Sequence, residues 1–143
     1  TRGQEQMTSY YRSELISLPE MEMAARRAYA MAGVGPEDID AASLYDAFSS
    51  EIIMQLESFG FAKPGEGVEL VREGALDIDG RLPNNTHGGL LSEAYIHGMN
   101  NIAEAARLIR GSSGNQPGKA IEHVLVSSGV GVPTGAMILG TDA

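Results

Sequence analysis

The 143-residue chain contains no cysteine. It can therefore form no disulfide and no thiolate-based zinc site, and it carries no cysteine nucleophile. Basic residues are also scarce and scattered, since 10 Lys and Arg stand against 19 Asp and Glu, which gives a formal net charge of −9. We expect no nucleic-acid partner, because a phosphate backbone is bound through a clustered basic surface.

Long apolar runs are absent as well. No segment approaches the length of a membrane span, and no basic-then-apolar signal segment opens the chain. We therefore expect a cytoplasmic protein with no membrane partner. The three histidines, His87, His97 and His123, show no metal-ligand spacing, so we predict no metal site.

The hydrophobic pattern that is present predicts an α/β layered domain, in which helices pack on a mixed sheet. The expected order is helix, strand, helix, long connection, helix, strand and strand. The corresponding residues are 19–32, 39–45, 47–59, 60–83, 90–110, 121–127 and 136–139.

Two of these helices carry more detailed expectations. Asp46 is interpreted as the N-cap of the second helix, and the apolar face of that helix is expected to be buried. That face consists of Phe48, Ile52, Leu56 and Phe59. The third helix follows Gly88-Gly89 and continues to Gly111. We expect one stripe of it to be covered, namely Leu91, Ala94, Tyr95, Gly98, Ile102, Ala105 and Leu108.

Three short segments could carry chemistry. The first, residues 44–48, leaves a strand and enters a helix, which is where α/β proteins bind ligands. The second, residues 84–89, has paired glycines before a helix, whose backbone N–H groups suit an anionic or carbonyl oxygen. The third, residues 127–133, is a glycine-rich corner between two strands.

Each feature also has a purely structural interpretation, which the residues alone leave open. Tyr45 could be a packed aromatic beside a helix cap. The asparagines of residues 84–89 could hydrogen-bond within a strained turn. Tyr95 could be a core tyrosine with one satisfied hydroxyl.

Taken together, the three segments resemble the thiolase superfamily in order, spacing and position. That family has Asn-Glu-Ala-Phe after a strand, then Asn-x-x-Gly-Gly followed by Gly-His-Pro, and finally a Cys-x-Gly-x-Gly loop. Here residues 45–48 match the first motif, 85–89 the second and 125–131 the third. Tyr95 falls at the family's catalytic histidine. The run from residue 87 to residue 100 is most similar to a thiolase-like branch of lipid-transfer proteins that includes steroid side-chain retro-aldolases.

The resemblance implies a layered thiolase-fold half with several partners. Residues 17–143 would form a thiolase-like C-terminal domain, and residues 1–16 would be a linker from an N-terminal half. The implied partners are that N-terminal half, a second copy in a homodimer, and an OB-fold protein that helps to bind acyl-CoA. No cofactor is implied on this chain, because CoA is part of the substrate.

The resemblance further implies a retro-aldolase that cleaves a β-hydroxyacyl-CoA by tyrosine acid–base catalysis. Tyr45 and Tyr95 replace an asparagine and a histidine of the thiolase pattern, and both match positions at which these aldolases are thought to use tyrosine. Residues expected around the substrate and its oxyanion are His87, Gly88, Gly89, Gly129 and Gly131.

Two other functions remain open at this stage. A thiolase-type acyltransferase could use a cysteine supplied by an N-terminal half, although this chain lacks the family's histidine and cysteine. A non-catalytic lipid carrier or structural subunit would explain degenerate motifs, but not two tyrosines at two catalytic positions.

Overall fold

The computed structural model describes residues 18–130 and 133–141. The expected linker 1–16 and Gly131 therefore lie outside the described residues. The elements are α1 (Pro19–Ala32), the 3₁₀ turn η2 (Pro36–Asp38), β1 (Ala41–Ser43), α2 (Ser49–Ser58), α3 (Gly67–Arg72), α4 (Gly89–Ser92), α5 (Met99–Ile109), β2 (His123–Ser128) and β3 (Gly135–Gly140).

The sheet is mixed, as the sequence predicts, with the order β1-β2-β3. β1 pairs parallel to β2, and β2 pairs antiparallel to β3. On the other side of β1, a single parallel bridge joins Ala42 to Asn84. Within the described residues, the segment at Asn84 therefore continues the sheet by one short step beyond β1.

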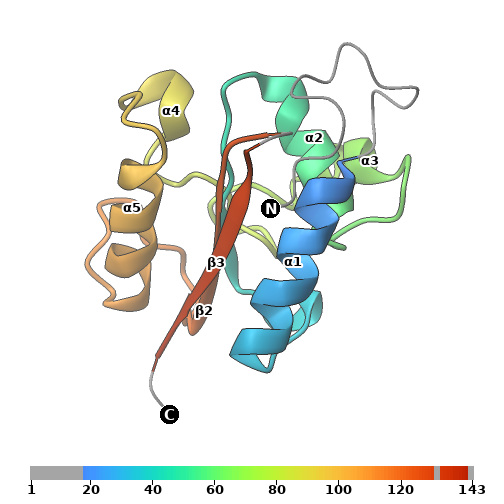
Figure 1. The fold of residues 1–143 in the computed structure, drawn as a ribbon. Helices are drawn as coiled ribbons and strands as arrows, with labels where there is room; N and C mark the ends of the chain where they lie inside the picture. Colours follow the sequence, from blue (N-terminus) through green and yellow to red (C-terminus); the bar gives the residue numbers. More distant parts are fainter. Residues whose placement is uncertain (1–17, 131–132, 142–143) are drawn as a thin grey trace.

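The helices cover both faces of this sheet. α1, α2 and α3 lie on one side and α4 and α5 on the other, with β2 and β3 between them (Figure 1). Successive side chains of a strand point to opposite faces. In β2 this alternation places Leu125 in the core cluster with α1 and α2, and it places Val124 and Val126 in a second cluster with α5.

The first helix matches its prediction at both ends. Pro19 stands at its first position, and Gly33 ends it with φ of 72° while its N–H donates to the Tyr29 carbonyl at 2.8 Å. β1 is shorter than expected, because side chains take over the backbone groups after Ser43. The Leu44 N–H donates to Asn84 Oδ1 at 3.3 Å, and the Tyr45 N–H donates to Ser127 Oγ at 2.8 Å.

The prediction of a single third helix over residues 90–110 is wrong, because the helix is interrupted between α4 and α5. α4 ends at Ser92, and further along His97 and Gly98 adopt φ of 52° and 88°, a left-handed pair through which no single α-helix can continue. Leu91 is 60% exposed and Tyr95 is 54% exposed, and Ala94 is also exposed. The covered stripe expected there is therefore found only from Gly98 onward, where Gly98, Ala105 and Leu108 are buried and Ile102 is partly buried.

The predicted N-cap at Asp46 is also wrong. Phe48 occupies the N-cap position of α2, its N–H donates to Glu51 Oε2 at 3.3 Å, and its side chain is 67% exposed instead of buried. The buried Asp46 caps α4 instead: Oδ1 accepts from the Leu90 N–H at 2.8 Å and Oδ2 from the Leu91 N–H at 3.5 Å. A carboxylate is favoured there by the partial positive charge of a helix N-terminus.

A second acidic side chain, Glu104 on α5, is 2% exposed and joins three segments. It accepts hydrogen bonds from Thr86 Oγ1 at 2.7 Å, Ser113 Oγ at 2.5 Å and Arg107 Nη1 at 3.4 Å. Burial by itself would raise the pKa of this carboxyl. The hydrogen bonds from Ser113, Thr86 and Arg107 outweigh burial, so the pKa of Glu104 lies below its ordinary value.

None of the helices in the described part of the chain has the length and apolar character that crossing a bilayer requires.

Gly89→Ala should destabilise the protein more than an ordinary glycine substitution. Gly89 has φ of 68°, and a Cβ added there would overlap the Asp46 carboxylate. Gly33→Ala is the matched control, because Gly33 has φ of 72° and nothing within 4 Å of the added Cβ. We expect about 1–2 kcal/mol of destabilisation for the control and about 1–3 kcal/mol more for Gly89→Ala. Equal losses in urea unfolding would contradict the contact with Asp46.

Glu104→Gln should lower the free energy of unfolding by about 1.5–3 kcal/mol near neutral pH, because it removes charge-assisted hydrogen bonds. The folded-state pKa is depressed, so this stability is present above the unfolded value of 4.5 and is lost as pH falls through the folded value. The difference between wild type and variant should shrink below that point. Exposed Glu69, which accepts from Arg72, provides the control: Glu69→Gln should change stability by less than about 1 kcal/mol.

Candidate active site

The structure brings the two predicted tyrosines together. Tyr45 follows β1, Tyr95 lies in the loop between α4 and α5, and their hydroxyl oxygens are 2.6 Å apart. The ring centroids are 6.3 Å apart with an interplanar angle of 65°. Tyr95 is more than half exposed, so the interpretation of this residue as a core tyrosine is wrong.

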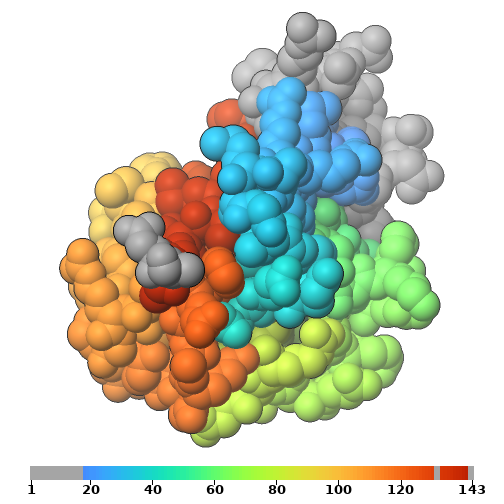
Figure 2. All heavy atoms as spheres, turned by 90° about the horizontal axis from the view of Figure 1, so that it is seen from below, coloured from blue at the N-terminus to red at the C-terminus, as the bar shows by residue number. Residues whose placement is uncertain are grey.

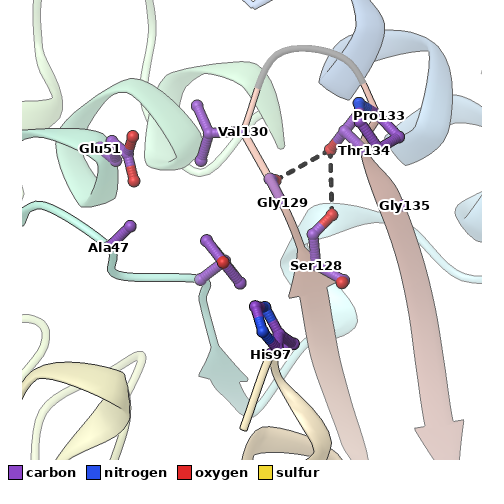
Figure 3. A pocket seen from close by; sticks show the side chains of 10 residues that line it. Ala47, Glu51, His97, Ser128, Gly129, Val130, Pro133, Thr134 and Gly135 are labelled. Atoms are coloured by element: carbon purple, nitrogen blue, oxygen red, sulfur yellow. Dashed lines mark hydrogen bonds between the residues drawn. The ribbon is translucent and has the colours of Figure 1, made fainter. Parts of the chain in front are cut away.

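Tyr45 lines a cavity of about 620 Å³. The other lining residues come from the start of α2, the loop before α5 and the turn from β2 to β3: Ala47, Glu51, His97, Ser128, Gly129, Val130, Pro133, Thr134 and Gly135. Figure 3 shows Glu51 on α2 and His97 before α5 at opposite ends of this lining. Tyr95 is not itself among the lining residues, but it contacts both Tyr45 and His97.

A second cavity of about 250 Å³ adjoins the first. The two share His97, Ser128 and Gly135, and the second extends between α5 and the strands β2 and β3. Its remaining lining is mostly apolar, with Met99, Ile102, Val126, Ala136 and Met137 among the residues. A polar region beside the tyrosines thus leads into an apolar one.

The environment of Tyr45 keeps its phenol protonated at neutral pH. Burial is the main cause that raises its pKa, to about 12, and the hydrogen bond to Tyr95 and the negative charges of Glu51 and Asp46 act in the same direction. Tyr45 therefore presents an O–H group to its surroundings under ordinary conditions. Either of the two tyrosine oxygens can be the donor in their shared hydrogen bond.

Sequence reasoning missed two residues of the cavity. Glu51 is half-buried, and burial raises the pKa of its carboxyl. It lies in the first turn of α2, four residues after Ala47, which also lines the cavity. The His97 ring packs edge-on against Tyr95, with centroids 4.8 Å apart. The only sequence signal for His97 is its place two residues after Tyr95.

Asparagines fix the backbone immediately before Tyr45, whereas the structural interpretation of residues 84–89 had them bonding within their own turn. The carbonyl of Leu44 accepts from Asn85 Nδ2 at 2.9 Å and from Asn101 Nδ2 at 3.3 Å. Asn84 binds the N–H of Leu44 on the other side of that residue. Asn85 has φ of 49°, a left-handed conformation that asparagine tolerates better than most residues.

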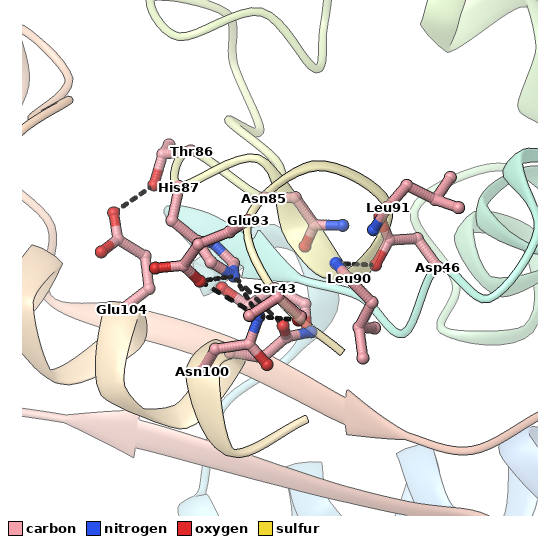
Figure 4. Close-up of polar contacts among 12 residues, drawn as sticks. Ser43, Asp46, Asn85, Thr86, His87, Leu90, Leu91, Glu93, Asn100 and Glu104 are labelled. Carbon is pink, nitrogen blue, oxygen red and sulfur yellow. Dashed lines mark hydrogen bonds and ion pairs between the residues drawn. The ribbon is translucent and has the colours of Figure 1, made fainter. Parts of the chain in front are cut away.

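Another asparagine holds the loop that carries Tyr95. Asn100 Nδ2 donates to the Ala94 carbonyl at 2.9 Å and to Glu93 Oε2 at 3.1 Å. The same cluster contains His87, whose side chain is 4% exposed and whose Nε2 lies 3.2 Å from Asn101 Oδ1 (Figure 4). His87 is therefore buried beside the first turn of α5 and does not line the cavity of Tyr45.

The glycines predicted to bind an oxyanion fall in different places. The Gly88 N–H donates to the Asn85 carbonyl at 2.8 Å, and Asp46 occupies the N–H groups that follow Gly89. Gly129 does line the cavity, with φ of 72°, and a Cβ on it would lie 2.5 Å from the Pro133 carbonyl oxygen. Of the five expected substrate contacts, the structure thus brings Gly129 to Tyr45, and Gly131 lies outside the described residues.

Comparison with curated proteins gives two relatives at more than half identity. The chain is 55% identical, over 97% of its length, to the "Steroid side-chain-cleaving aldolase" of Thermomonospora curvata. It is 52% identical, over 94% of its length, to the "17-hydroxy-3-oxo-4-pregnene-20-carboxyl-CoA lyase" of Mycobacterium tuberculosis. It covers 35% and 34% of these two proteins, so it spans about a third of their length.

A more distant relative is "Sterol carrier protein 2" of Rattus norvegicus, 35% identical over 85% of this chain and covered to 23% of its own length. Among solved structures, the one named "Ltp2-ChsH2(DUF35) aldolase" matches with a TM-score of 0.90 and 56% sequence identity, over 94% of this chain and 35% of that one. The family described as "Thiolase C-terminal domain-like" matches residues 2–141. The chain, with its mixed sheet between two helical layers, belongs to this thiolase family.

Proposed function

We propose that the protein containing this chain is a retro-aldolase. It cleaves a β-hydroxyacyl-CoA, the CoA thioester of a steroid side chain, into a ketone and a shorter acyl-CoA. The observation that carries this proposal is the 2.6 Å hydrogen bond between the Tyr45 and Tyr95 hydroxyls beside the cavity. The names of the two relatives at 55% and 52% identity, an aldolase and a carboxyl-CoA lyase, support it.

The chemistry needs one proton removed and one proton delivered. Removal of the β-hydroxyl proton lets the Cα–Cβ bond break, which releases the ketone and leaves the electron pair as the enolate of the shorter thioester. Protonation of the α-carbon then completes the reaction. No covalent intermediate forms, so the absence of cysteine from this chain does not oppose it.

The tyrosine pair can perform both transfers through its shared hydrogen bond. One phenol accepts the β-hydroxyl proton as it passes its own proton to the other phenol, which protonates the α-carbon. The net charge of the pair is unchanged, and neither tyrosine has to be ionised beforehand. This suits a Tyr45 whose pKa is raised to about 12. General acid–base assistance of this kind contributes about 10²–10⁴ in rate.

The cavities suit the two ends of such a substrate differently. The apolar cavity beside Met99 and Ile102 suits part of a steroid, and the backbone at Gly129 suits the thioester oxygen. No Lys or Arg is among the described residues that line either cavity. We therefore propose that the phosphates of CoA are held by cations of an OB-fold partner or of the rest of the protein.

The exposed surface around Tyr95 supports further assembly. Leu91, Ile96 and Met99 are 60%, 54% and 61% exposed, which is unusual for large apolar side chains close together along the chain. We propose that an N-terminal half of thiolase topology covers this surface and that two such copies form a homodimer.

Tyr45→Phe and Tyr95→Phe should each reduce kcat for cleavage of a steroid β-hydroxyacyl-CoA by at least about 10², because each removes a proton-transfer group. Stability should change little, since a hydroxyl is lost without much volume. Tyr29→Phe is the matched control: it removes a hydroxyl that donates to the Phe59 carbonyl at 2.9 Å, away from the cavity, and should leave kcat near wild type.

The assay is product analysis with the intact protein and its partner. Near-normal turnover in both cavity variants would contradict tyrosine catalysis. If the wild type converted acetoacetyl-CoA and CoA to acetyl-CoA and left the steroid thioester intact, it would be an acyltransferase. Turnover of neither substrate would favour a lipid carrier.

A further inference from the structure

The backbone of Tyr45 is held in a closed ring of hydrogen bonds by two side chains. The Tyr45 N–H donates to Ser127 Oγ at 2.8 Å, and Ser127 Oγ donates to Gln55 Oε1 at 2.6 Å. Gln55 Nε2 then donates to the carbonyl oxygen of Tyr45 at 2.6 Å. Both backbone polar groups of Tyr45 are thus fixed by one connected pair of side chains.

The two side chains come from different elements and are completely buried. Gln55 lies on α2 and Ser127 on β2, 72 residues apart in sequence, and each is 0% exposed. Gln55 Nε2 also donates to the Glu51 carbonyl at 3.0 Å, so it ties Tyr45 to the first turn of α2. A buried polar network is favourable only when its members are hydrogen-bonded, and a satisfied network specifies one geometry.

This ring of hydrogen bonds lies where it can fix the backbone of Tyr45 relative to the cavity. Tyr45 lies two residues beyond the end of β1, where regular backbone sheet pairing has stopped. Its N–H donates instead to a side chain of β2, Ser127, so side-chain hydrogen bonds fix its backbone. α2 and the end of β2 also supply Glu51, Ser128 and Gly129 to the cavity wall. The ring therefore fixes Tyr45 relative to two walls of the cavity that it lines.

We propose that Gln55 and Ser127 are positioning residues, which orient Tyr45 so that its hydroxyl meets that of Tyr95 within the cavity. The inference rests on the proposed function for its consequence in catalysis, but the placement of the tyrosine hydroxyl can be measured without substrate. Gln55 lines neither cavity. Ser127 is among the residues that line the smaller cavity, but its Oγ is taken up by the Tyr45 N–H and Gln55 Oε1, so both side chains are expected to act through Tyr45.

The kinetic test uses Gln55→Met and Ser127→Ala in the intact protein with its partner. Each should lower kcat about 10-fold or more, because small misplacement of a catalytic group is costly, whereas KM should stay within about 2-fold. Ser127→Thr keeps the hydroxyl and should restore most of kcat. Glu104→Gln is the control, since it breaks a buried hydrogen-bond cluster that touches neither tyrosine. It should lower Tm and leave kcat unchanged.

The second readout is the titration of Tyr45, followed by NMR of ¹³C-labelled tyrosine between about pH 8 and pH 11. In the wild type Tyr45 should stay mostly protonated over this range, because its pKa is raised to about 12. Gln55→Met and Ser127→Ala should weaken the hydrogen bond to Tyr95, which is one of the causes that raise the pKa of Tyr45, so Tyr45 should begin to ionise at a lower pH than in the wild type. The Glu104→Gln protein should titrate as the wild type does.

The two readouts separate this inference from the proposed function. If the variants lose only Tm and keep both kcat and the wild-type titration of Tyr45, Gln55 and Ser127 are structural and the inference is overturned. If the wild type cleaves no β-hydroxyacyl-CoA but the variants still shift the Tyr45 titration, the proposed function fails and the positioning role stands.

Discussion

The parallel pairing of β1 with β2 determines where every part of the site can lie. Its register sets Ser43 opposite Val126, so both strands end at one edge of the sheet. The carboxyl ends of parallel strands are where α/β folds gather ligand-binding groups. Tyr45 leaves the first strand and Ser128-Gly129 leaves the second, and the cavity forms between them. An antiparallel pair would have sent these residues to opposite ends of the sheet.

At this edge of the sheet, side chains supply the hydrogen bonds that neighbouring strands supply elsewhere. Beyond Ser43 the backbone needs donors and acceptors that no strand supplies, and asparagine, serine and glutamine side chains provide them. This arrangement lets the chain turn into α2 while the backbone N–H and carbonyl groups of Leu44 and Tyr45 stay hydrogen-bonded. On the opposite side, the carboxylate of Asp46 binds the start of α4, so the residue next to Tyr45 also anchors the segment that leads to Tyr95.

Much of the fold follows from local sequence signals. The proline and glycine at the ends of α1 and the apolar runs of β2 and β3 are sufficient to predict those elements, because each signal acts within a few residues. The pair Tyr45 and Tyr95 was predicted from the spacing of motifs, together with a family resemblance, and no property of either residue alone distinguished it from a packed aromatic.

The parts that could not be predicted depend on distant contacts or on backbone geometry. The partners of Asp46 lie 44 and 45 residues away, so a local capping rule assigned it to the wrong helix. Apolar residues keep helical spacing through the non-helical segment that contains His97 and Gly98, because that spacing carries no information on left-handed backbone conformation. Burial of Glu51 at the cavity likewise depends on the tertiary structure. Its place three residues after Phe48 is typical of a helix-capping glutamate and does not predict that burial.

β3 has a consequence for how the protein behaves when its packing fails. Within the described residues it pairs only with β2, it reaches the surface between α1 and the α5 side of the molecule (Figure 2), and its six residues carry no charge and no proline. In the part of the chain that the structure describes, one edge of β3 is unpaired, and an apolar strand edge of that kind is a template for strand addition by another chain. Damage that loosens the layers around it should therefore appear as precipitation, because intermolecular sheet growth competes with refolding.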